Sequence, residues 1–238
     1  MHEYTPVWPH GPLTEILPDV FLVTGTNKTQ QAGIALQFSR NMTVIRTDQE
    51  LALINTVRLS ESALDDLDAL GTVASIVRLG AFHGRDDAFY RDRYGAPLWA
   101  LPGVRHEHGA RADMILEPGR SAPFENASAF AFETSRAPEA ALHVDRHGGV
   151  LLTCDSVQNW GAADRFFSPA CAKIFKAQGL FQPTNISHVW RDATGVRAMD
   201  FARLLERSFR HLISAHGPPI LGDAHARLTA AVERVYGG

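Results

Sequence analysis

The chain has 238 residues, of which 45% are hydrophobic and 21% are charged, and its formal net charge is −3. This is the composition of a globular protein with a substantial core, and it lacks the basic excess of a nucleic-acid-binding protein. No apolar run approaches the roughly 20 residues of a membrane-spanning helix. The two cysteines, Cys154 and Cys171, exclude a disulfide scaffold and a four-cysteine zinc site.

The beginning of the chain lacks the basic and then apolar pattern of a signal peptide, because residues 1–12 carry two histidines, a glutamate and three prolines. We therefore expect a cytoplasmic protein with reduced thiols and with neither a membrane nor a nucleic acid as partner. The length suits one large domain, and we expect a single domain over residues 1–238.

Strands and helices are predicted from apolar runs, periodicity and turn residues. Two short strands are expected in residues 13–23, on either side of a Pro-Asp turn. Further strands are expected at residues 33–38, 42–46, 51–55, 73–79, 97–101, 114–116, 128–134, 140–145, 150–153 and 211–215. Helices are expected at residues 60–70, 89–94, 168–178, 199–210 and 222–236.

The helix over residues 60–70 has the clearest signals, with Ser60 as N-cap, Leu64 and Leu67 on an apolar stripe, and Gly71 at its end. It joins two apolar strands, which predicts a crossover with parallel pairing. The order of elements along the chain suggests two similar halves, each a mixed sheet covered by helices. We therefore predict an α/β fold of four layers, an αββα sandwich.

Three polar turns follow apolar strands, where layered α/β proteins collect ligands. The first contains His83 and Asp87, the second contains Asp155, and the third contains His216. One aspartate after a strand is usually a turn or cap residue, and one such histidine is usually structural. The three turns together favour a functional site. The alternative is an unrelated α/β fold in which these turns occur by coincidence.

These turns resemble the metal-binding motifs of the metallo-β-lactamase superfamily, whose fold is the αββα sandwich. The resemblance covers residues 13–222 and includes the closing turn of residues 214–219. It implies one or two metal ions, usually zinc and sometimes iron or manganese, and hydrolysis of an ester, lactone, lactam, thioester or phosphoester. It further implies His83, Asp87, Asp155 and His216 as metal ligands, with Asp87 and His83 taking part in catalysis.

The motif is incomplete. Where the family has HxHxDH, this chain has His83-Gly84-Arg85-Asp86-Asp87-Ala88, so an arginine and an alanine stand at two histidine positions. Arg136 stands at the position of the family's middle histidine. The remaining ligands imply a site for one ion at most, of zinc, iron or manganese.

Two functional interpretations follow. In the first, the protein is a mononuclear metal hydrolase that acts on a small molecule. In the second, it is a metal-free homologue without catalysis, in which Arg85 and Arg136 pair directly with Asp87 and Asp155 and bind a carboxylate or phosphate ligand.

Other candidates have structural explanations. His106 and His108 lie in a polar loop, where solvated side chains are the expectation. Cys154 is expected in the core rather than as a nucleophile. The aromatic residues Trp160, Phe166 and Phe167 are expected either in the core or in an apolar substrate surface.

Overall fold

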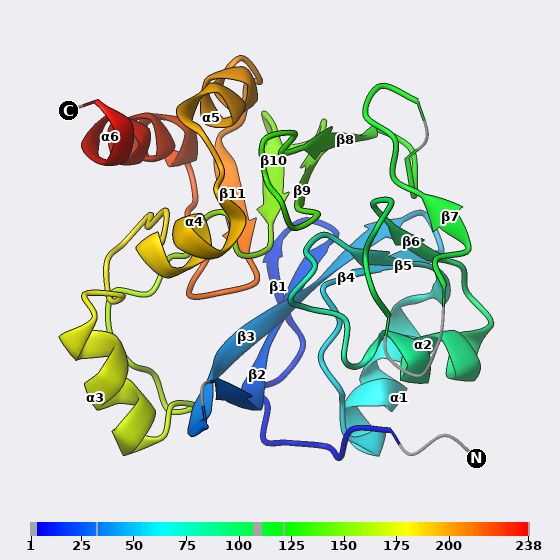
Figure 1. Ribbon diagram of the computed structural model, residues 1–238. Coiled ribbons are helices and arrows are strands. Elements are labelled where there is room, and N and C mark those ends of the chain that lie inside the picture. The colour runs from blue at the N-terminus through cyan, green and yellow to red at the C-terminus, as the bar shows by residue number, and fades with distance from the viewer. Residues whose placement is uncertain (1–3, 32, 107–110, 121, 238) are drawn as a thin grey trace.

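The computed structural model describes residues 4–31, 33–106, 111–120 and 122–237. In these residues the strands form two sheets (Figure 1). Across the first sheet lie, in order, β1 (Thr14–Leu17), β2 (Val20–Gln31), β3 (Ile34–Thr47), β4 (Glu50–Ile54), β5 (Thr72–Arg78), β6 (Leu98–Ala100) and β7 (Met114–Ile115). Across the second lie β11 (His211–Ser214), β10 (Val150–Thr153), β9 (Ala140–Val144) and β8 (Ala127–Ala131).

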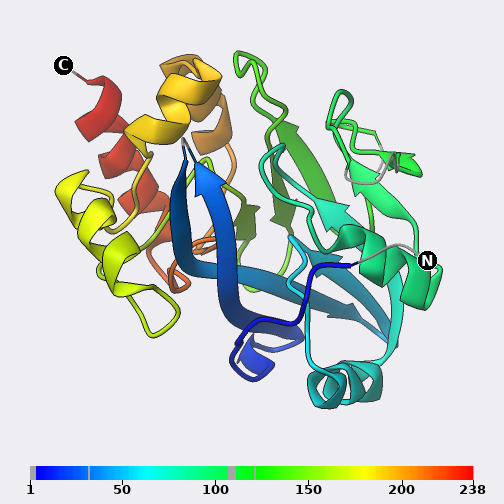
Figure 2. The ribbon, with the colours of Figure 1, turned by 60° about the horizontal axis from the view of Figure 1, so that its bottom comes forward.

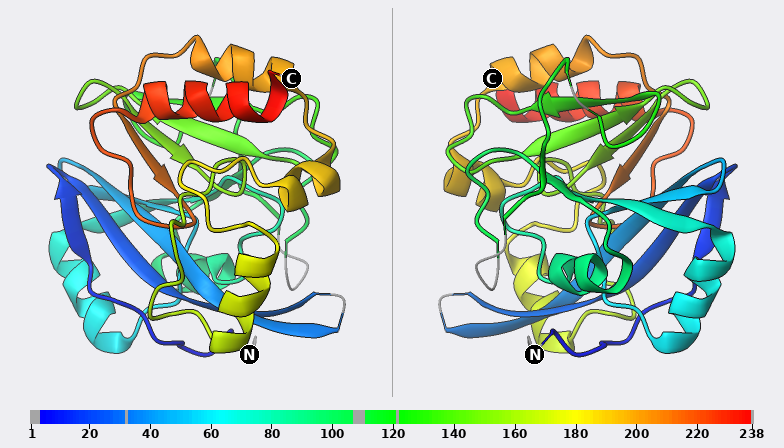
Figure 3. Two further views of the ribbon diagram at one scale, coloured as in Figure 1. Left: turned by 90° about the vertical axis from the view of Figure 1, so that its left-hand side faces the viewer. Right: turned by 90° about the vertical axis from the view of Figure 1, so that its right-hand side faces the viewer.

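Helices cover the outer faces of both sheets, which gives the four layers seen in Figure 3. The helices are α1 (Glu61–Leu70), α2 (Asp87–Tyr94), α3 (Pro169–Ala177), α4 (His188–Thr194), α5 (Ala198–Leu205) and α6 (Ala224–Tyr236). One apolar layer packs α1 and α2 on the first sheet, and another packs α4, α5 and α6 on the second. The predicted αββα sandwich is therefore confirmed.

The inner faces of the two sheets share one apolar core. Ile54 and Val77 from the first sheet meet Leu142, Leu152 and Ile213 from the second, and all are almost fully buried. The pairing of β4 with β5 is parallel, as the helix between them predicts. The two halves are less alike than expected, because in the described residues one sheet has seven strands and the other four.

The strands expected at residues 33–38 and 42–46 are one continuous strand, β3. The sequence suggests a break because Ser39, Arg40 and Asn41 are polar. All three are buried, however, and each has a polar partner: Ser39 accepts from Trp160, Arg40 pairs with Asp86, and Asn41 bonds the loop after β11. Hydrogen bonding thus allows three polar residues inside the sheet.

Other elements also differ from the sequence prediction, among them β2, which continues to Gln31 where the expected strand ended at residue 23. The β3–β4 hairpin has a tight turn at Asp48 and Gln49 rather than a four-residue loop. The helix α5 ends at Leu205, five residues before the expected end at residue 210. The helix α4 was not predicted, although Ser187 and Gly195 stand at its two ends.

The outer halves of β2 and β3, residues 26–31 and 34–39, form a two-stranded arm that extends beyond the other strands (Figures 2 and 3). The helix α3 packs against this β2–β3 arm through Leu36, Trp160 and Phe175. None of the helices in the described part of the chain has the length and apolarity that crossing a lipid bilayer requires.

Candidate metal centre

Parallel pairing of β10 and β11 brings two of the predicted site residues to one edge of the second sheet. Thr153 is in register with Ser214, so the turns that follow both strands begin side by side. Asp155 lies in the first turn and His216 in the second. The His216 Nε2 atom is 3.0 Å from the Asp155 Oδ1 atom.

His83 reaches the same place from the first sheet. The segment after β5 pairs with the start of β9 through a bridge between Gly80 and Glu139, so the turn that holds His83 lies against the second sheet. The His83 Nε2 atom is 3.1 Å from the His216 Nε2 atom and 3.6 Å from the Asp155 Oδ2 atom. We call His83, Asp155 and His216 the site cluster.

Buried polar residues of β3 hold the His216 loop in position. The Asn41 side-chain amide donates to the carbonyl oxygens of Ser214 and Gly217, at 2.9 and 2.7 Å. The His216 Nδ1 atom lies 3.3 Å from the Ser39 carbonyl oxygen. Because a carbonyl oxygen only accepts, this contact places a proton on Nδ1. The Nε2 atom, which faces Asp155, then donates to the carboxylate when the ring is protonated and offers a lone pair to a metal ion when the ring is neutral.

The donor set of the site cluster suits one metal ion. Ligand atoms held about 2.0–2.1 Å from a tetrahedral ion lie about 3.3 Å from one another. In the cluster the two Nε2 atoms are 3.1 Å apart, and the carboxylate distances are 3.0 Å from His216 Nε2 to Asp155 Oδ1 and 3.6 Å from His83 Nε2 to Asp155 Oδ2. Two acceptors as close as His216 Nε2 and Asp155 Oδ1 need a proton or a cation between them. Two imidazoles and one carboxylate form a ligand set typical of iron, manganese or zinc.

The two histidines differ in the surroundings of their second ring nitrogen, Nδ1. In most metal sites that nitrogen donates to a carbonyl or carboxylate, which fixes the ring. His216 has such a partner in Ser39, whereas the buried His83 Nδ1 atom has none among the described residues. The ring of His216 is therefore the better oriented of the two.

Burial and mutual attraction set the charges of the cluster. Burial lowers the pKa of His83, and the Asp155 carboxylate opposes that change. Burial acts to raise the pKa of Asp155, but the charge of His83 and the hydrogen bonds from His216 and His83 outweigh it, and the net pKa is well below the usual aspartate value. The cluster thus offers an ionised carboxylate, the form that binds metal.

Cys154 is a neighbour of the site cluster. One ligand atom each from His83, Cys154 and Asp155 lies within 4.8 Å of the other two. Burial and the charge of Asp155 raise the pKa of the Cys154 thiol well above its usual value. Cys154 and Cys171 are both free and buried, and a protonated Cys154 thiol matches its predicted place in the core rather than a nucleophilic role.

Glu139 is a buried carboxyl next to the cluster that the sequence analysis did not identify. Its Oε1 atom accepts from the backbone N–H of Ser156, at 2.7 Å. Burial and the charge of Asp155 raise the pKa of Glu139 well above its usual value. The only sequence signal for this buried group is that a glutamate stands directly before the apolar strand β9. The same pattern is common at strand ends whose carboxylates are exposed.

Asp87, the second predicted carboxylate ligand, is buried at the start of α2. Its Oδ1 atom accepts from the Thr56 hydroxyl at 2.6 Å, and its Oδ2 atom has no hydrogen-bond partner within the described residues. Burial raises the pKa of Asp87, against the charge of Arg78 and the Thr56 hydrogen bond. No hydrogen bond in the described structure joins Asp87 to the cluster, and its role as ligand or proton acceptor stays a prediction.

The expected pairs of Arg85 and Arg136 with Asp87 and Asp155 are not formed among the described residues. The Arg85 guanidinium leaves its turn toward β2 and donates to the Asn27 side chain and the Lys28 carbonyl oxygen. Arg136 donates to the carbonyl oxygen of Asp192 near the end of α4. Sequence spacing predicts where a backbone position lies but not the direction of a long side chain. The predicted network, in which these arginine–aspartate pairs replace the metal ion, was therefore wrong.

The buried arginine–aspartate pair that does form joins Arg40 to Asp86. Of the two loop histidines, His106 lies beside Arg78, with its Nδ1 atom 3.5 Å from a guanidinium nitrogen. Burial lowers the pKa of His106. His108 lies outside the described residues.

The site cluster faces a cavity of about 570 Å³ whose lining includes all three of its residues. The rest of the lining is largely apolar and aromatic: Leu36, Phe38, Phe82, Trp160, Ile174, Phe175, Leu180, Val189 and Trp190. Asp155 is the one carboxylate in the described lining, which contains no lysine or arginine. Trp160 lines this cavity and also belongs to the buried apolar cluster beneath α3, so both of the expectations for it are met.

Comparison with solved structures shows that the chain has the metallo-β-lactamase fold. The structure of the DIM-1 metallo-β-lactamase exposed to ceftazidime matches with a TM-score of 0.61 and 13% identity, over 98% of this chain and 100% of that one. A metallo-β-lactamase from Pontibacter korlensis matches with a TM-score of 0.60 and 13% identity, over 93% and 98%. FIM-1 from Pseudomonas aeruginosa, in its mono-zinc form, gives 0.61 and 12%, over 94% and 96%.

At these identities the likeness is one of fold. No protein-family model matches the chain, and no curated protein matches it. The predicted fold is confirmed, and the interpretation of an unrelated α/β fold is wrong.

Proposed function

We propose that the protein is a hydrolase that uses a single metal ion, held by His83, Asp155 and His216, and that it acts on an uncharged ester or lactone with an apolar group. The observation that carries this proposal is the convergence of three side chains at the wall of a largely apolar cavity: the two Nε2 atoms are 3.1 Å apart, and each lies 3.0 to 3.6 Å from an oxygen of Asp155. FIM-1, a protein of the same fold, is described in a mono-zinc form, which supports a one-ion site in this architecture.

When bound, zinc, iron or manganese supplies a Lewis acid for the scissile carbonyl and lowers the pKa of the attacking water. The chain's own residues prepare the site for that chemistry. The Ser39 carbonyl fixes the proton of His216 on Nδ1, and the two histidines keep Asp155 ionised. The apolar walls exclude bulk water, which strengthens electrostatic interactions in the cavity.

The uncharged substrate follows from the lining of the cavity. The metal ion would compensate a single anionic group at the reacting centre, but away from the ion the described lining contains no lysine or arginine to pair with a carboxylate or phosphate of the substrate. The aromatic and aliphatic walls offer instead a surface for an acyl or aryl group. Phe82 is exposed to 59%, so it can also contact substrate from the solvent side.

A screen of p-nitrophenyl esters tests the proposal. We expect the protein reconstituted with zinc, manganese or iron(II) to hydrolyse the butyrate and octanoate esters, and the hemisuccinate ester, which carries a carboxylate, at least tenfold less efficiently. Asp155→Asn and His216→Ala should lower kcat/KM at least 100-fold, whereas Arg136→Gln should leave it within twofold. Equal rates in the Asp155→Asn variant, or no ester hydrolysed with any of the three metals, would overturn the proposal in favour of a metal-free binding protein.

We also propose a cytoplasmic location. Both cysteines are free and buried in the structure, which suits a reducing compartment.

A further inference from the structure

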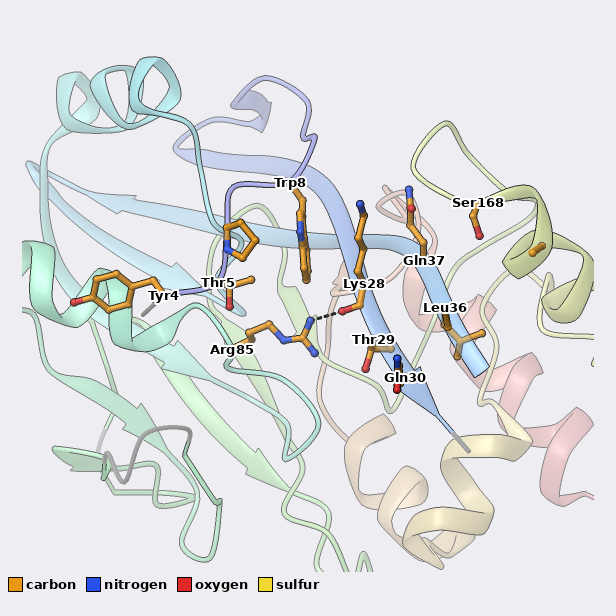
Figure 4. A pocket seen from close by; sticks show the side chains of 13 residues that line it. Tyr4, Thr5, Trp8, Lys28, Thr29, Gln30, Leu36, Gln37, Arg85 and Ser168 are labelled. Carbon is orange, nitrogen blue, oxygen red and sulfur yellow. Dashed lines mark hydrogen bonds between the residues drawn. The ribbon is translucent and has the colours of Figure 1, made fainter. Parts of the chain in front are cut away.

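A second cavity, of about 970 Å³, lies beside the β2–β3 arm (Figure 4). Its lining comes from the N-terminal segment, from the arm, from the turn before α2 and from the start of α3; Trp8, Lys28, Thr29, Gln37, Arg85 and Ser168 are the residues that matter here. The two cavities share Thr29, Gln30 and Leu36, so the arm forms a wall of both. No residue of the site cluster lines the second cavity.

The charge of this cavity is positive and uncompensated. Arg85 and Lys28 are the charged residues of its described lining, which contains no aspartate or glutamate. The Arg85 guanidinium is held in place by neutral groups alone: its Nη1 atom donates to the Asn27 side-chain oxygen at 3.1 Å and to the Lys28 carbonyl oxygen. Its position is therefore fixed while its charge is not neutralised.

Two further contacts support an oriented cationic group. The guanidinium carbon of Arg85 lies 5.4 Å from the ring centroid of Trp8, within the range of a cation–π interaction. The Lys28 ammonium has neither an ion pair nor a hydrogen bond among the described residues, and Lys28 and Trp8 both line the cavity. Two cations and no carboxylate in the described lining give the cavity a positive potential, which favours an anion.

Neutral donors complete the lining. Thr29 and Ser168 contribute hydroxyl groups, and Gln30 and Gln37 contribute amides. The Ser168 oxygen accepts from the backbone N–H of Cys171 as the N-cap of α3, so its own proton remains available to donate. This is the combination of groups that binds an oxyanion: a fixed guanidinium, an ammonium and several neutral donors.

We propose that the cavity at Arg85, Lys28 and Trp8 binds a small organic ligand through a phosphate or carboxylate group. The volume exceeds that of an inorganic ion and matches the upper range of small-molecule sites, so the anionic group belongs to a larger molecule. The inference does not depend on the metal centre. It gives Arg85 the anion-binding role that the sequence suggested, but in a cavity separate from the one that holds the site cluster.

Isothermal titration calorimetry on the metal-free full chain tests this site, because removing metal prevents anions from binding at the cluster. The probes are phenyl phosphate and benzoate, which distinguish phosphate from carboxylate recognition, and neutral benzamide. We expect phenyl phosphate or benzoate, or both, to bind at one site per chain, with a Kd at least tenfold below that of benzamide and rising with salt concentration.

Variants locate the binding. Arg85→Gln should weaken binding at least tenfold and Lys28→Gln about threefold, whereas Arg85→Lys should retain part of the affinity. Arg136→Gln is the matched control, since it also removes a guanidinium held by a neutral carbonyl oxygen, and it should stay within twofold. Thermal melting verifies that each variant is folded. If neither anion binds, or if Arg85→Gln binds with the same affinity as the wild type, the inference is overturned. The proposal of a metal site is unaffected by either result.

Discussion

His216 Nε2 lies 3.0 Å from Asp155 Oδ1, although the two residues are 61 positions apart in the chain. The contact exists because β10 and β11 are parallel neighbours whose ends are in register. His83 completes the cluster from the other sheet, so the candidate metal centre depends on how the two sheets are packed. Residues that fix this packing should therefore affect metal binding without being ligands.

Asn41 is the strongest such residue. Its buried amide donates to Ser214 and Gly217 on either side of His216 and accepts from the Thr24 hydroxyl. Asn41→Ala leaves buried groups unpaired, and we expect a loss of about 1–3 kcal/mol in the free energy of unfolding together with weaker metal binding. Urea denaturation and metal titration measure the two effects. Thr229→Ala, which removes a hydrogen bond within α6, should leave metal affinity unchanged, and equal losses of metal affinity in both variants would contradict the role of Asn41.

Gly217 allows the His216 loop to pass close to the neighbouring backbone. Its φ angle is +87°, and a Cβ atom would lie 2.4 Å from the carbonyl carbon of Asn159. Gly222 has a similar φ of +96° but no described atom within 4 Å of such a Cβ. We expect Gly222→Ala to cost about 1–2 kcal/mol of stability, and Gly217→Ala to cost clearly more and to lower metal affinity. Similar melting temperatures for the two variants would count against the close approach.

Glu139 should make the metal-free protein less stable as pH rises. Because its pKa is raised in the folded state, the unfolded chain releases the proton first, and the free energy of unfolding falls with pH above about 4.3, the usual glutamate value. Glu139→Gln keeps the acceptor for Ser156 and cannot ionise. We expect this variant to be as stable as the wild type near pH 4 and more stable near pH 7 by urea denaturation. A stability difference that is independent of pH would refute this explanation.

Phe175 should contribute to substrate affinity rather than to chemistry. It lines the cavity of the site cluster, with its ring centroid 5.5 Å from that of Trp160. Phe175→Ala removes apolar contacts worth about 1–2 kcal/mol, so KM for an octanoate ester should rise about 5- to 30-fold with little change in kcat. Phe130→Ala, in the outer core of the second sheet, controls for lost stability. A fall in kcat alone would place Phe175 outside substrate binding.

Much of the fold was predictable because apolar runs and turn residues mark the elements locally. The strands before His83, Asp155 and His216 are continuous apolar segments, and each polar turn follows its strand directly. Their convergence was implied by the resemblance to a known fold. The parallel pairing predicted from the sequence was that of β4 with β5, and the pairing of β10 with β11, which brings Asp155 beside His216, was not predicted.

What the sequence did not reveal depends on contacts between distant segments. Ser39, Arg40 and Asn41 look like a strand break until their partners in other segments are known. Glu139 is buried because Gly80 and Ser156 meet it from separate loops. Arg85 and Arg136 are long side chains whose direction is set by acceptors on β2 and near the end of α4, and no spacing rule supplies that information.

The most direct measurement is the metal content of the protein by elemental mass spectrometry, on protein expressed without a histidine tag and dialysed after purification. The account predicts about one zinc, iron or manganese ion per chain, lost in Asp155→Ala and His216→Ala and retained in Arg136→Ala. A chain that holds no stoichiometric metal, even after reconstitution with zinc, manganese and iron(II), would contradict the account.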